Sequence, residues 1–220
     1  ELEFEFTDHI SVFDKVIPSL IPRKGETLCR TSAYWFSRAH TMGIPTHFRE
    51  IISPNRMRVS RVKILKNPTF NDSNYLVPLE FISRYYVAGS LHDRMTSGTI
   101  DPHTLGLSNP HYGAELPDPF IEVTTKLEKV DRPLEKEEAL AISGLTKEEY
   151  EDIVEITLKI DDDINKEVRK RGLIHVDGKK EFALDTERTI MVAETYGTAD
   201  EDRFWDLKAY QEGNHVELSK

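Results

Sequence analysis

Three charged residues alternate in the segment "VDGKKEF" (176–182), where Asp177, Lys179 and Glu181 occupy every second position. Successive side chains of a β-strand point to opposite faces, so on a strand these three would share one face. An acid, a base and an acid are poorly suited to a hydrophobic core. Such a set is better suited to binding a ligand, and its lysine could contact a substrate phosphate or carboxylate.

The next strand-like segment, "TIMVAE" (189–194), ends in Glu194. The two segments predict a β-hairpin across which Glu181 and Glu194 converge. Two carboxylates are a common way to hold magnesium beside phosphates. The alternative is a solvated hairpin face with a surface Lys–Glu pair, which contributes little to stability. The spacing alone favours this simpler alternative.

Two further segments contain residue types that bind anions. Arg84 and Ser90 flank "YYVAG" (85–89), whose small residues let the backbone approach a ligand, while Arg and Ser are natural phosphate donors. A surface arginine beside a turn explains the same pattern. In "PRKG" (22–25) two cations precede a predicted helix, which suits an anion at a helix N-terminus but also describes an ordinary loop end.

Other conspicuous residues are expected to be structural. Asp161, Asp162 and Asp163 are consecutive positions of a predicted helix and point in different directions, which predicts a solvated helix face. Three histidines lack the spacing of metal ligands and are expected in loops or at the surface: His47, His103 and His111. Four aromatic residues are expected as core anchors: Trp35, Phe36, Phe204 and Trp205.

Hydrophobic periodicity predicts the elements that position these residues. Strands are predicted at 1–6, 56–65 and 74–90, and helices at 26–43, 134–143 and 147–171. Thr146 and Glu149 form a capping box for the last helix, Gly172 ends it, and Pro78 places part of its strand at an edge or a bend. Residues 91–125 are expected to be mostly loop, and such long loops are usually functional. This order of elements favours an α+β fold over regular βαβ alternation.

Length and composition limit the classes of function. The 220 residues suffice for one large domain or two small lobes, and 38% hydrophobic with 31% charged residues is ordinary for a soluble globular protein. A formal charge of −10 argues against a nucleic-acid partner. The lone Cys29 excludes an internal disulfide and favours a reducing, cytoplasmic location. No apolar run approaches ~18 residues, so no membrane span is expected.

Eight segments are distributed through nearly the whole chain: "TDHISVFD" (7–14), "IPRKG" (21–25), "SAYWF" (32–36), "GIPTHF" (43–48), "VPLEFISRYYVAGS" (77–90), "ELPDPFIEVTTKLE" (115–128), "GLIHVDGKKEFAL" (172–184) and "DEDRFWD" (200–206). Taken together and in this order, they resemble motifs of the SAICAR synthetase family of de novo purine synthesis. Each match alone is weak, but eight in the right order are a specific signal.

The resemblance implies a two-lobed α+β fold with antiparallel sheets, flanking helices and an ATP cleft between an N-terminal lobe (1–76) and a C-terminal lobe (77–220). It implies a ligase that uses ATP and Mg²⁺ to join the carboxylate of the imidazole ribonucleotide CAIR to the amine of L-aspartate, giving SAICAR, ADP and phosphate. A carboxylate is a poor electrophile, and phosphorylation turns it into an acyl phosphate; magnesium and lysine neutralise charge during that transfer. A homo-oligomer is expected, with a dimer favoured.

The resemblance also assigns residues to roles. Glu181 and Glu194 would hold magnesium. Lys179 would contact CAIR at its end of the site, and Asp177 would orient that contact. Lys126 and Asp131 would border the reacting groups, with Asp131 a candidate to assist the amine. The CAIR 5′-phosphate would be held by Arg84, Ser90 and Arg203. Adenine would lie along the hinge formed by Val77, Leu79 and Glu80. The aspartate side of the cleft would be lined by Asp8, Ser11, Lys24 and Gly25.

Three departures from the family pattern keep two other functions open. The sequence starts after the family's glycine-rich strand turn over the ATP phosphates, so either a stretch precedes these residues or part of the ATP site is lacking. In "AETYGTADEDR" (193–203) Glu194 replaces an Asp and the spacing is longer by one, and Gly178 stands where an aromatic residue or Thr is usual. The alternatives are a small-molecule kinase on a related two-lobed scaffold and a catalytically dead binding paralogue.

Overall fold

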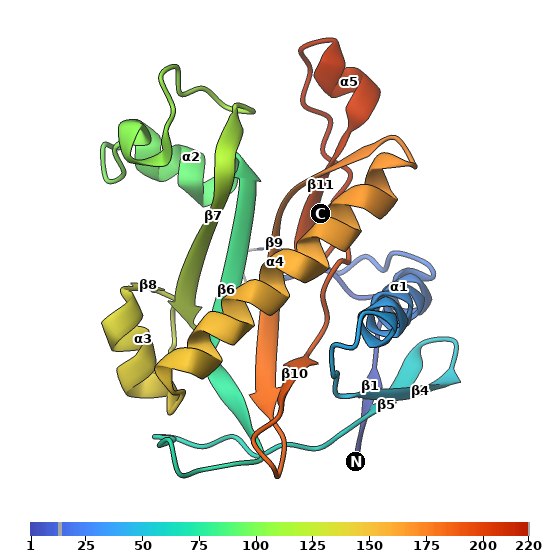
Figure 1. Cartoon of the computed structure of the whole chain (residues 1–220). Helices are drawn as coiled ribbons and strands as arrows, with labels where there is room; N and C mark the ends of the chain where they lie inside the picture. The colour runs from blue at the N-terminus through green and yellow to red at the C-terminus, as the bar shows by residue number, and fades with distance from the viewer. Residues whose placement is uncertain (13–14, 220) are drawn as a thin grey trace.

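The computed structural model describes residues 1–12 and 15–219, arranged around one large antiparallel sheet (Figure 1). Its strands are β6 (Tyr75–Tyr86), β7 (Glu115–Thr125), β8 (Pro133–Leu134), β9 (Leu173–Leu184), β10 (Ile190–Ala193) and β11 (Asp202–Asp206). The order is β10-β9-β6-β7-β8, and β11 also pairs with β9. The expected α+β fold with antiparallel sheets and the β9–β10 hairpin are therefore confirmed. Phe13 and Asp14 of "TDHISVFD", and Lys220, lie outside the described residues.

The N-terminal part of the chain forms two small sheets. One has the order β1-β5-β4, formed by β1 (Leu2–Glu5), β4 (Phe48–Ser53) and β5 (Arg56–Val59); the other pairs β2 (Ser11–Val12) with β3 (Lys15–Val16). The strand predicted at 1–6 is confirmed, whereas the one predicted from residue 56 ends at Val59. Strand β4 was not predicted because it buries none of its six residues and so shows no clear alternation.

The helices are α1 (Lys24–Thr41), α2 (Gly89–Thr96), α3 (Lys136–Ser143), α4 (Lys147–Arg169), α5 (Leu207–Gln211) and the 3₁₀ turn η1 (Pro102–Leu105). The capping box is confirmed, because the Glu149 amide donates to Thr146 Oγ1 at 3.1 Å and the Thr146 amide donates to Glu149 Oε2 at 2.8 Å. Helix α4 crosses one face of the large sheet, and α1 lies beside it (Figure 1). Within the described part of the chain, each helix is too short or too polar to cross a bilayer.

The expectation of a mostly irregular stretch at 91–125 was wrong, because this stretch contains most of α2, the turn η1 and strand β7. Two prolines, Pro117 and Pro119, obscured β7. They fall in its irregular part, between the pairing of Glu115 with Tyr86 and that of Phe120 with Arg84. A proline that donates no hydrogen bond is tolerated at such an irregularity.

The main apolar core of the described residues lies between the helices and the sheets. The four aromatic residues expected as anchors are all buried, which confirms that prediction. The Phe36 ring of α1 lies 5.3 Å from the Tyr196 ring, so residues before and after position 76 share this core. The lobe boundary expected at 76/77 falls inside β6.

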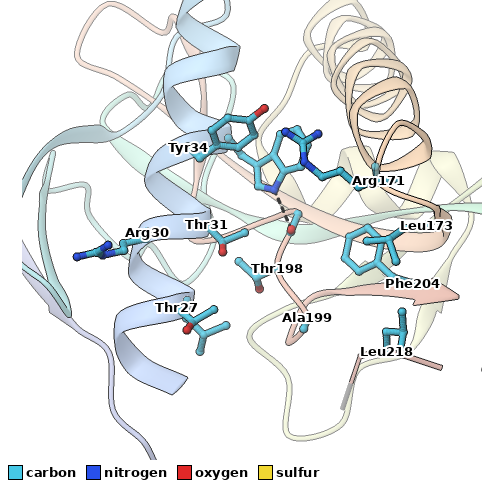
Figure 2. A pocket seen from close by; sticks show the side chains of 14 residues that line it. Thr27, Arg30, Thr31, Tyr34, Arg171, Leu173, Thr198, Ala199, Phe204 and Leu218 are labelled. Carbon is cyan, nitrogen blue, oxygen red and sulfur yellow. Dashed lines mark hydrogen bonds between the residues drawn. The ribbon is translucent and has the colours of Figure 1, made fainter. Parts of the chain in front are cut away.

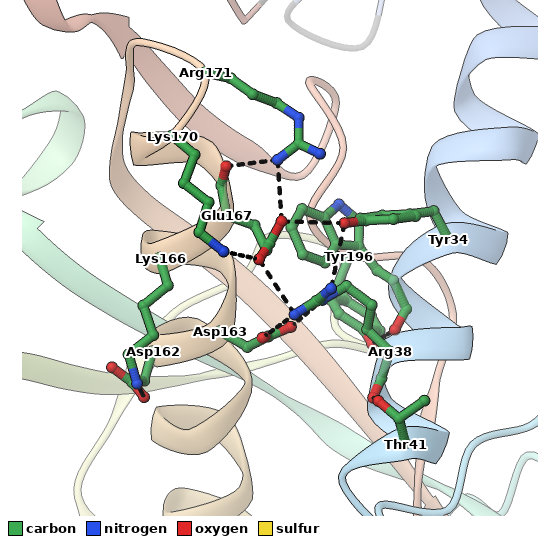
Figure 3. Close-up of polar contacts among 11 residues, drawn as sticks. Tyr34, Arg38, Thr41, Asp162, Asp163, Lys166, Glu167, Lys170, Arg171 and Tyr196 are labelled. Carbon is green, nitrogen blue, oxygen red and sulfur yellow. Dashed lines mark hydrogen bonds and ion pairs between the residues drawn. The ribbon is translucent and has the colours of Figure 1, made fainter.

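The aspartates at 161–163 are not a solvated helix face, and that prediction was wrong for two of the three. Asp161 is fully buried and accepts a hydrogen bond from Ser83 Oγ. Asp163 accepts two hydrogen bonds from Arg38 of α1, at 2.6 and 2.5 Å, in the α1–α4 ion-pair network of Figure 3. Only Asp162 is exposed. The reason is that α4 is covered on two sides, by the sheet and by α1.

Candidate functional site

Strand β9 presents Asp177, Lys179 and Glu181 on the face of the large sheet that points away from α4. The intervening Lys180 pairs with Asp161 of α4, and neighbouring side chains of a strand point to opposite faces. The predicted shared face is thus confirmed. Glu181 is only 4% exposed, so the simpler alternative of a solvated hairpin face was wrong.

Lys179 lies at the centre of this face. Its Nζ atom is 2.8 Å from Glu80 Oε1, 3.3 Å from Glu181 Oε1 and 3.3 Å from Glu201 Oε2. Burial alone would lower the pKa of Lys179, but the three carboxylates outweigh burial and hold that pKa above its usual value. Lys179 therefore supplies a permanent positive charge in a fixed position.

Glu194 and Lys126 complete what we call the charged cluster: Glu80, Lys126, Asp177, Lys179, Glu181, Glu194 and Glu201. Lys126 forms an ion pair with Glu181. Ala193 pairs with Glu181 across the hairpin, which brings Glu194 beside it. Burial and then repulsion from Glu181 raise the pKa of Glu194. Apart from Asp177, which pairs with arginines, four glutamates against two lysines leave a formal charge of −2, which suits a divalent cation.

The residues expected to hold a phosphate converge at one end of the cluster. Arg84 donates from Nη2 to Ser90 Oγ at 3.0 Å and from Nη1 to Asp177 Oδ2 at 3.3 Å. Arg203 Nη1 reaches the same Asp177 oxygen at 2.5 Å. Gly89 begins α2 with a φ of +50°, and a Cβ there would lie 2.8 Å from Arg203 Nη1. The positive φ favours glycine at this position, and the absence of a side chain leaves room for the Arg203 guanidinium.

Sequence reasoning missed three charged residues of the site, Glu122, Arg94 and Glu201. Glu122 is buried on β7, accepts a hydrogen bond from Arg84 Nε and pairs with Arg94 Nη2 at 2.5 Å. An acid between Ile121 and Val123 in a strand was the signal that could have identified Glu122. Glu201 lay within "DEDRFWD", where only Arg203 had been assigned a role.

The expected anion at the start of α1 is a side chain of this chain. Asp8 Oδ1 accepts from the Gly25 amide at 2.9 Å, and Oδ2 accepts from the Arg23 amide at 3.1 Å. A Cβ at Gly25 would lie 2.4 Å from the Phe6 carbonyl oxygen, which explains the glycine. Lys24 Nζ pairs with Asp200 at 2.5 Å, beside Glu201 in sequence. Asp8 and Gly25 thus position Lys24.

Four further predicted site residues differ in how far they are buried. The side chains of Val77 and Leu79 are fully buried in the main core, so these residues can offer a ligand only main-chain atoms. Ser11 is exposed in β2, and Asp131 is exposed between β7 and β8. Both side chains are therefore open to solvent.

His47 was expected in a loop or at the surface, and it lies in a bend just before β4 but is buried. It is 3% exposed, with its ring 5.4 Å from the Phe4 ring and 5.3 Å from the Phe36 ring. Its Nε2 lies 3.1 Å from the Glu194 carbonyl oxygen, and because a carbonyl only accepts, Nε2 carries the proton. Glu194 has a φ of +54°, an unfavourable conformation for a non-glycine residue. His47 therefore stabilises a strained residue of the charged cluster.

We expect the neutral form of His47 to make folding sensitive to acid. Burial lowers the pKa of His47 to about 4, whereas an unfolded histidine titrates near 6.5. Above pH 6.5 His47 is neutral in both the folded and the unfolded state and costs no stability. As the pH falls from 6.5 to 4, only the unfolded state gains a proton at this histidine, so the free energy of unfolding should fall by about 3 kcal/mol. Urea titrations across this range measure it, with His47→Gln compared with wild type.

A glutamine amide can replace the donor to Glu194 but does not titrate, so His47→Gln should show a smaller pH slope than wild type. The matched control is His103→Gln, at an exposed histidine, which should keep the wild-type slope. Equal slopes for wild type and His47→Gln would show that other groups carry the acid sensitivity.

A cavity of about 540 Å³ lies between α1, the end of α4 and the segment 197–199 (Figure 2). Its lining is largely apolar and aromatic, with Tyr34, Trp35 and Phe204 among its walls. The Trp35 indole donates to the Gly197 carbonyl oxygen at 2.8 Å. None of the charged-cluster residues lines it, so this cavity is separate from the candidate site.

Comparisons with known proteins agree on one family. The family model described as SAICAR synthetase matches residues 1–220. A phosphoribosylaminoimidazole-succinocarboxamide synthase of Thermoplasma volcanium is 55% identical over 220 residues, covering 100% of this chain and 75% of the relative; one of Thermoplasma acidophilum is 54% identical with the same coverage. The crystal structure of SAICAR synthetase from Pyrococcus horikoshii superimposes with a TM-score of 0.79 at 29% identity, covering 99% of this chain and 82% of that one. A SAICAR synthetase in complex with ADP has the same TM-score and identity and is 80% covered.

Proposed function

Because the chain belongs to the SAICAR synthetase family, we propose that it joins CAIR to L-aspartate at the expense of ATP, giving SAICAR, ADP and phosphate in purine biosynthesis. The observation that carries the proposal is the arrangement along β9. Asp177 contacts the arginines at one end of its charged face, and Glu181 contacts Lys126 at the other, with Lys179 between them. One face of β9 thus offers two arginines that can bind a phosphate and, separately, a cluster of carboxylates and lysines.

The CAIR 5′-phosphate binds at the arginine end in this proposal. Arg84 and Arg203 donate charge-assisted hydrogen bonds, and Ser90, the second residue of α2, adds its hydroxyl near a helix N-terminus that favours an anion. Asp177 contacts both arginines and orients them. Glu122 holds Arg84 from its other side. The imidazole carboxylate of CAIR then extends toward Lys179.

Lys179 and Lys126 act on the reacting groups. In the first step a carboxylate oxygen of CAIR attacks the γ-phosphorus of ATP, and ADP leaves. In the second step the amine of L-aspartate attacks the acyl carbon, loses a proton, and phosphate leaves with that carboxylate oxygen. Lys179, fixed by carboxylates before the substrates arrive, stabilises the negative charge on the transferring phosphoryl group. Asp131 remains our candidate to assist the amine.

A magnesium ion fits the chemistry of the charged cluster. Burial raises the pKa of Glu181, and repulsion from Glu181 adds to burial in raising that of Glu194, so a nearby cation would relieve an unfavourable pair. Carboxylate oxygens are the ligands that magnesium prefers. We therefore propose that Glu181 and Glu194 hold it. When bound, the ion neutralises phosphate charge.

The remaining assignments extend the proposal to the other ligands. Adenine lies along the main chain of Val77–Glu80, since the side chains of Val77 and Leu79 belong to the core. L-Aspartate binds on the side of Lys24, whose pairing with Asp200 places an ammonium near the loop that carries Glu201. Asp8, Ser11 and Gly25 support that side. Residues 1–76 and 77–220 act as two lobes of a cytoplasmic, dimeric enzyme.

The test is the substrate dependence of ADP formation. ADP should form at a steady rate only when ATP, magnesium, CAIR and L-aspartate are all present. With ¹⁸O in the CAIR carboxylate, the label should appear in phosphate during turnover. Rapid ADP formation without aspartate, with a stable phosphorylated product, would instead identify a kinase. Binding of CAIR without any ADP formation would identify a binding protein.

A further inference from the structure

The face of β9 opposite the charged cluster contains a fully buried ion-pair group. Lys180 pairs with Asp161 of α4 and with Asp202 of β11, at 3.4 Å from Asp202 Oδ2, and the three side chains are 0% exposed. Burial alone would lower the pKa of Lys180, but the two carboxylates outweigh it and raise that pKa. Such groups contribute little net stability compared with hydrophobic residues, and their best-attested role is to specify register.

Asp202 links three parts of the structure. Its Oδ1 accepts a hydrogen bond from the Gly197 amide at 2.9 Å, and its Oδ2 lies 2.8 Å from His175 Nε2. Asp161, His175 and Asp202 are residue types that bind metals, and their ligand atoms lie within 4.8 Å of one another. The ammonium of Lys180 pairs with both aspartates, so the chain itself supplies the cation of this group.

The register of β11 decides where its neighbours point. Asp202 pairs with Gly178 and Arg203 pairs with Asp177, but the register shifts immediately afterwards, between Arg203 and Phe204. The regular main-chain pairing of β11 with β9 is therefore interrupted beside Arg203, the residue proposed to bind phosphate. A slip of one residue would send Arg203 to the opposite face and withdraw Glu201 from Lys179.

Gly178 makes room for this arrangement. A Cβ built at Gly178 would lie 2.3 Å from Asp202 Oδ2 and 2.7 Å from Lys180 Nζ. The two charged side chains thus fill the space that a side chain at 178 would occupy. The need for this space accounts for a glycine at position 178, although glycine makes a strand more flexible than a residue with a side chain would.

We propose that Lys180 is a positioning residue for the ligase: by pairing with Asp202 on the buried face of β9, it fixes the register of β11 and so holds Arg203 and Glu201 against the charged face. The inference rests on the proposed function, because Arg203 matters through its contact with the CAIR phosphate. Lys180 itself lies on the far side of the strand and does not contact substrate.

A double-mutant cycle between Lys180 and Arg203 tests this, with the CAIR dissociation constant measured by calorimetry. Arg203→Ala should weaken CAIR binding by about 10- to 150-fold, because a charge-assisted hydrogen bond is lost. Lys180→Met should weaken it to a similar extent in the wild-type background but by less than about 3-fold in the Arg203→Ala background. Effects that multiply in the double variant would overturn the proposal, since Lys180 would then act independently of Arg203.

Two further variants keep the test decisive if Lys180→Met does not fold. Asp202→Asn keeps an acceptor for the Gly197 amide but loses the ion pair, and Gly178→Ala displaces the pair without removing a charge. Both should be coupled to Arg203 in the same way. The matched control is Asp162→Asn, next to Asp161 on α4 but exposed, which should leave CAIR binding unchanged.

Amide hydrogen exchange separates this inference from the proposed function. In Lys180→Met and Asp202→Asn, peptides covering residues 196–206 should exchange faster, while peptides from α1 should keep the wild-type rate. If wild type does not bind CAIR, the proposed function is wrong, and the exchange result alone decides whether Lys180 fixes β11. Unchanged exchange at 196–206 in both variants would overturn the register role.

Discussion

Replacing Lys179 by methionine is expected to lower kcat by about 10²–10³-fold, the usual effect of removing one preorganised charge that stabilises a transition state. The ammonium group is held by Glu80, Glu181 and Glu201, so it needs no reorganisation when the phosphoryl group transfers. Methionine has a similar length and no charge. Steady-state rates of ADP formation with saturating CAIR, L-aspartate and ATP measure the effect.

The KM for CAIR should change much less than kcat in Lys179→Met, because Arg84 and Arg203 hold the phosphate at the other end of β9. The matched control is Lys166→Met, which removes an exposed lysine of α4 and should keep wild-type kinetics. A kcat within about 3-fold of wild type for Lys179→Met would exclude Lys179 from the chemical step.

The position of the charged face could be predicted because its cause is local. Side chains alternate along any strand, so the two-residue spacing of Asp177, Lys179 and Glu181 was enough to place them together. The capping box of α4 was predictable for the same reason, since Thr146 and Glu149 interact within one helical turn. The resemblance to SAICAR synthetases then supplied roles that spacing alone did not.

The buried charges could not be predicted, because their burial depends on partners distant in sequence. A helix position such as Asp161 is solvated or buried according to what packs on it, and its partners Ser83 and Lys180 come from two separate strands. The burial of His47 was not predicted for the same reason, because its ring partners Phe4 and Phe36 come from different elements. No local sequence pattern predicts contacts between residues that lie so far apart in the chain.

The partners of Lys179 illustrate the same limit within the site. Glu181 is two residues away on the same strand and was predicted with it. Glu201 comes from the segment before β11, and its importance appears only once β11 is paired with β9. Part of the site is thus encoded in strand periodicity and part in the register of a strand whose sequence, "DRFWD", gives no clear strand pattern.

The second large effect is expected at Glu181. Glu181→Gln keeps the shape of the side chain and removes its charge, so the charged cluster loses one of the two carboxylates proposed to hold magnesium. We expect kcat to fall by about 10²–10³-fold at millimolar magnesium. The magnesium concentration that gives half of maximal activity should also rise, because one ligand has lost its charge. Initial rates measured over a magnesium titration give both quantities.

Loss of the Glu181 charge also changes the balance of the cluster, and this separates metal binding from a general folding defect. Lys126 and Lys179 would face one carboxylate fewer, yet a neutral glutamine removes no packing, so the free energy of unfolding in the absence of magnesium should stay close to that of wild type. Glu187→Gln, in the exposed turn of the same hairpin, is the matched control and should keep a normal magnesium dependence. A Glu181→Gln protein with a low kcat but an unchanged magnesium dependence would assign Glu181 to the positioning of Lys126 and Lys179, and the metal would then have to be held by other residues.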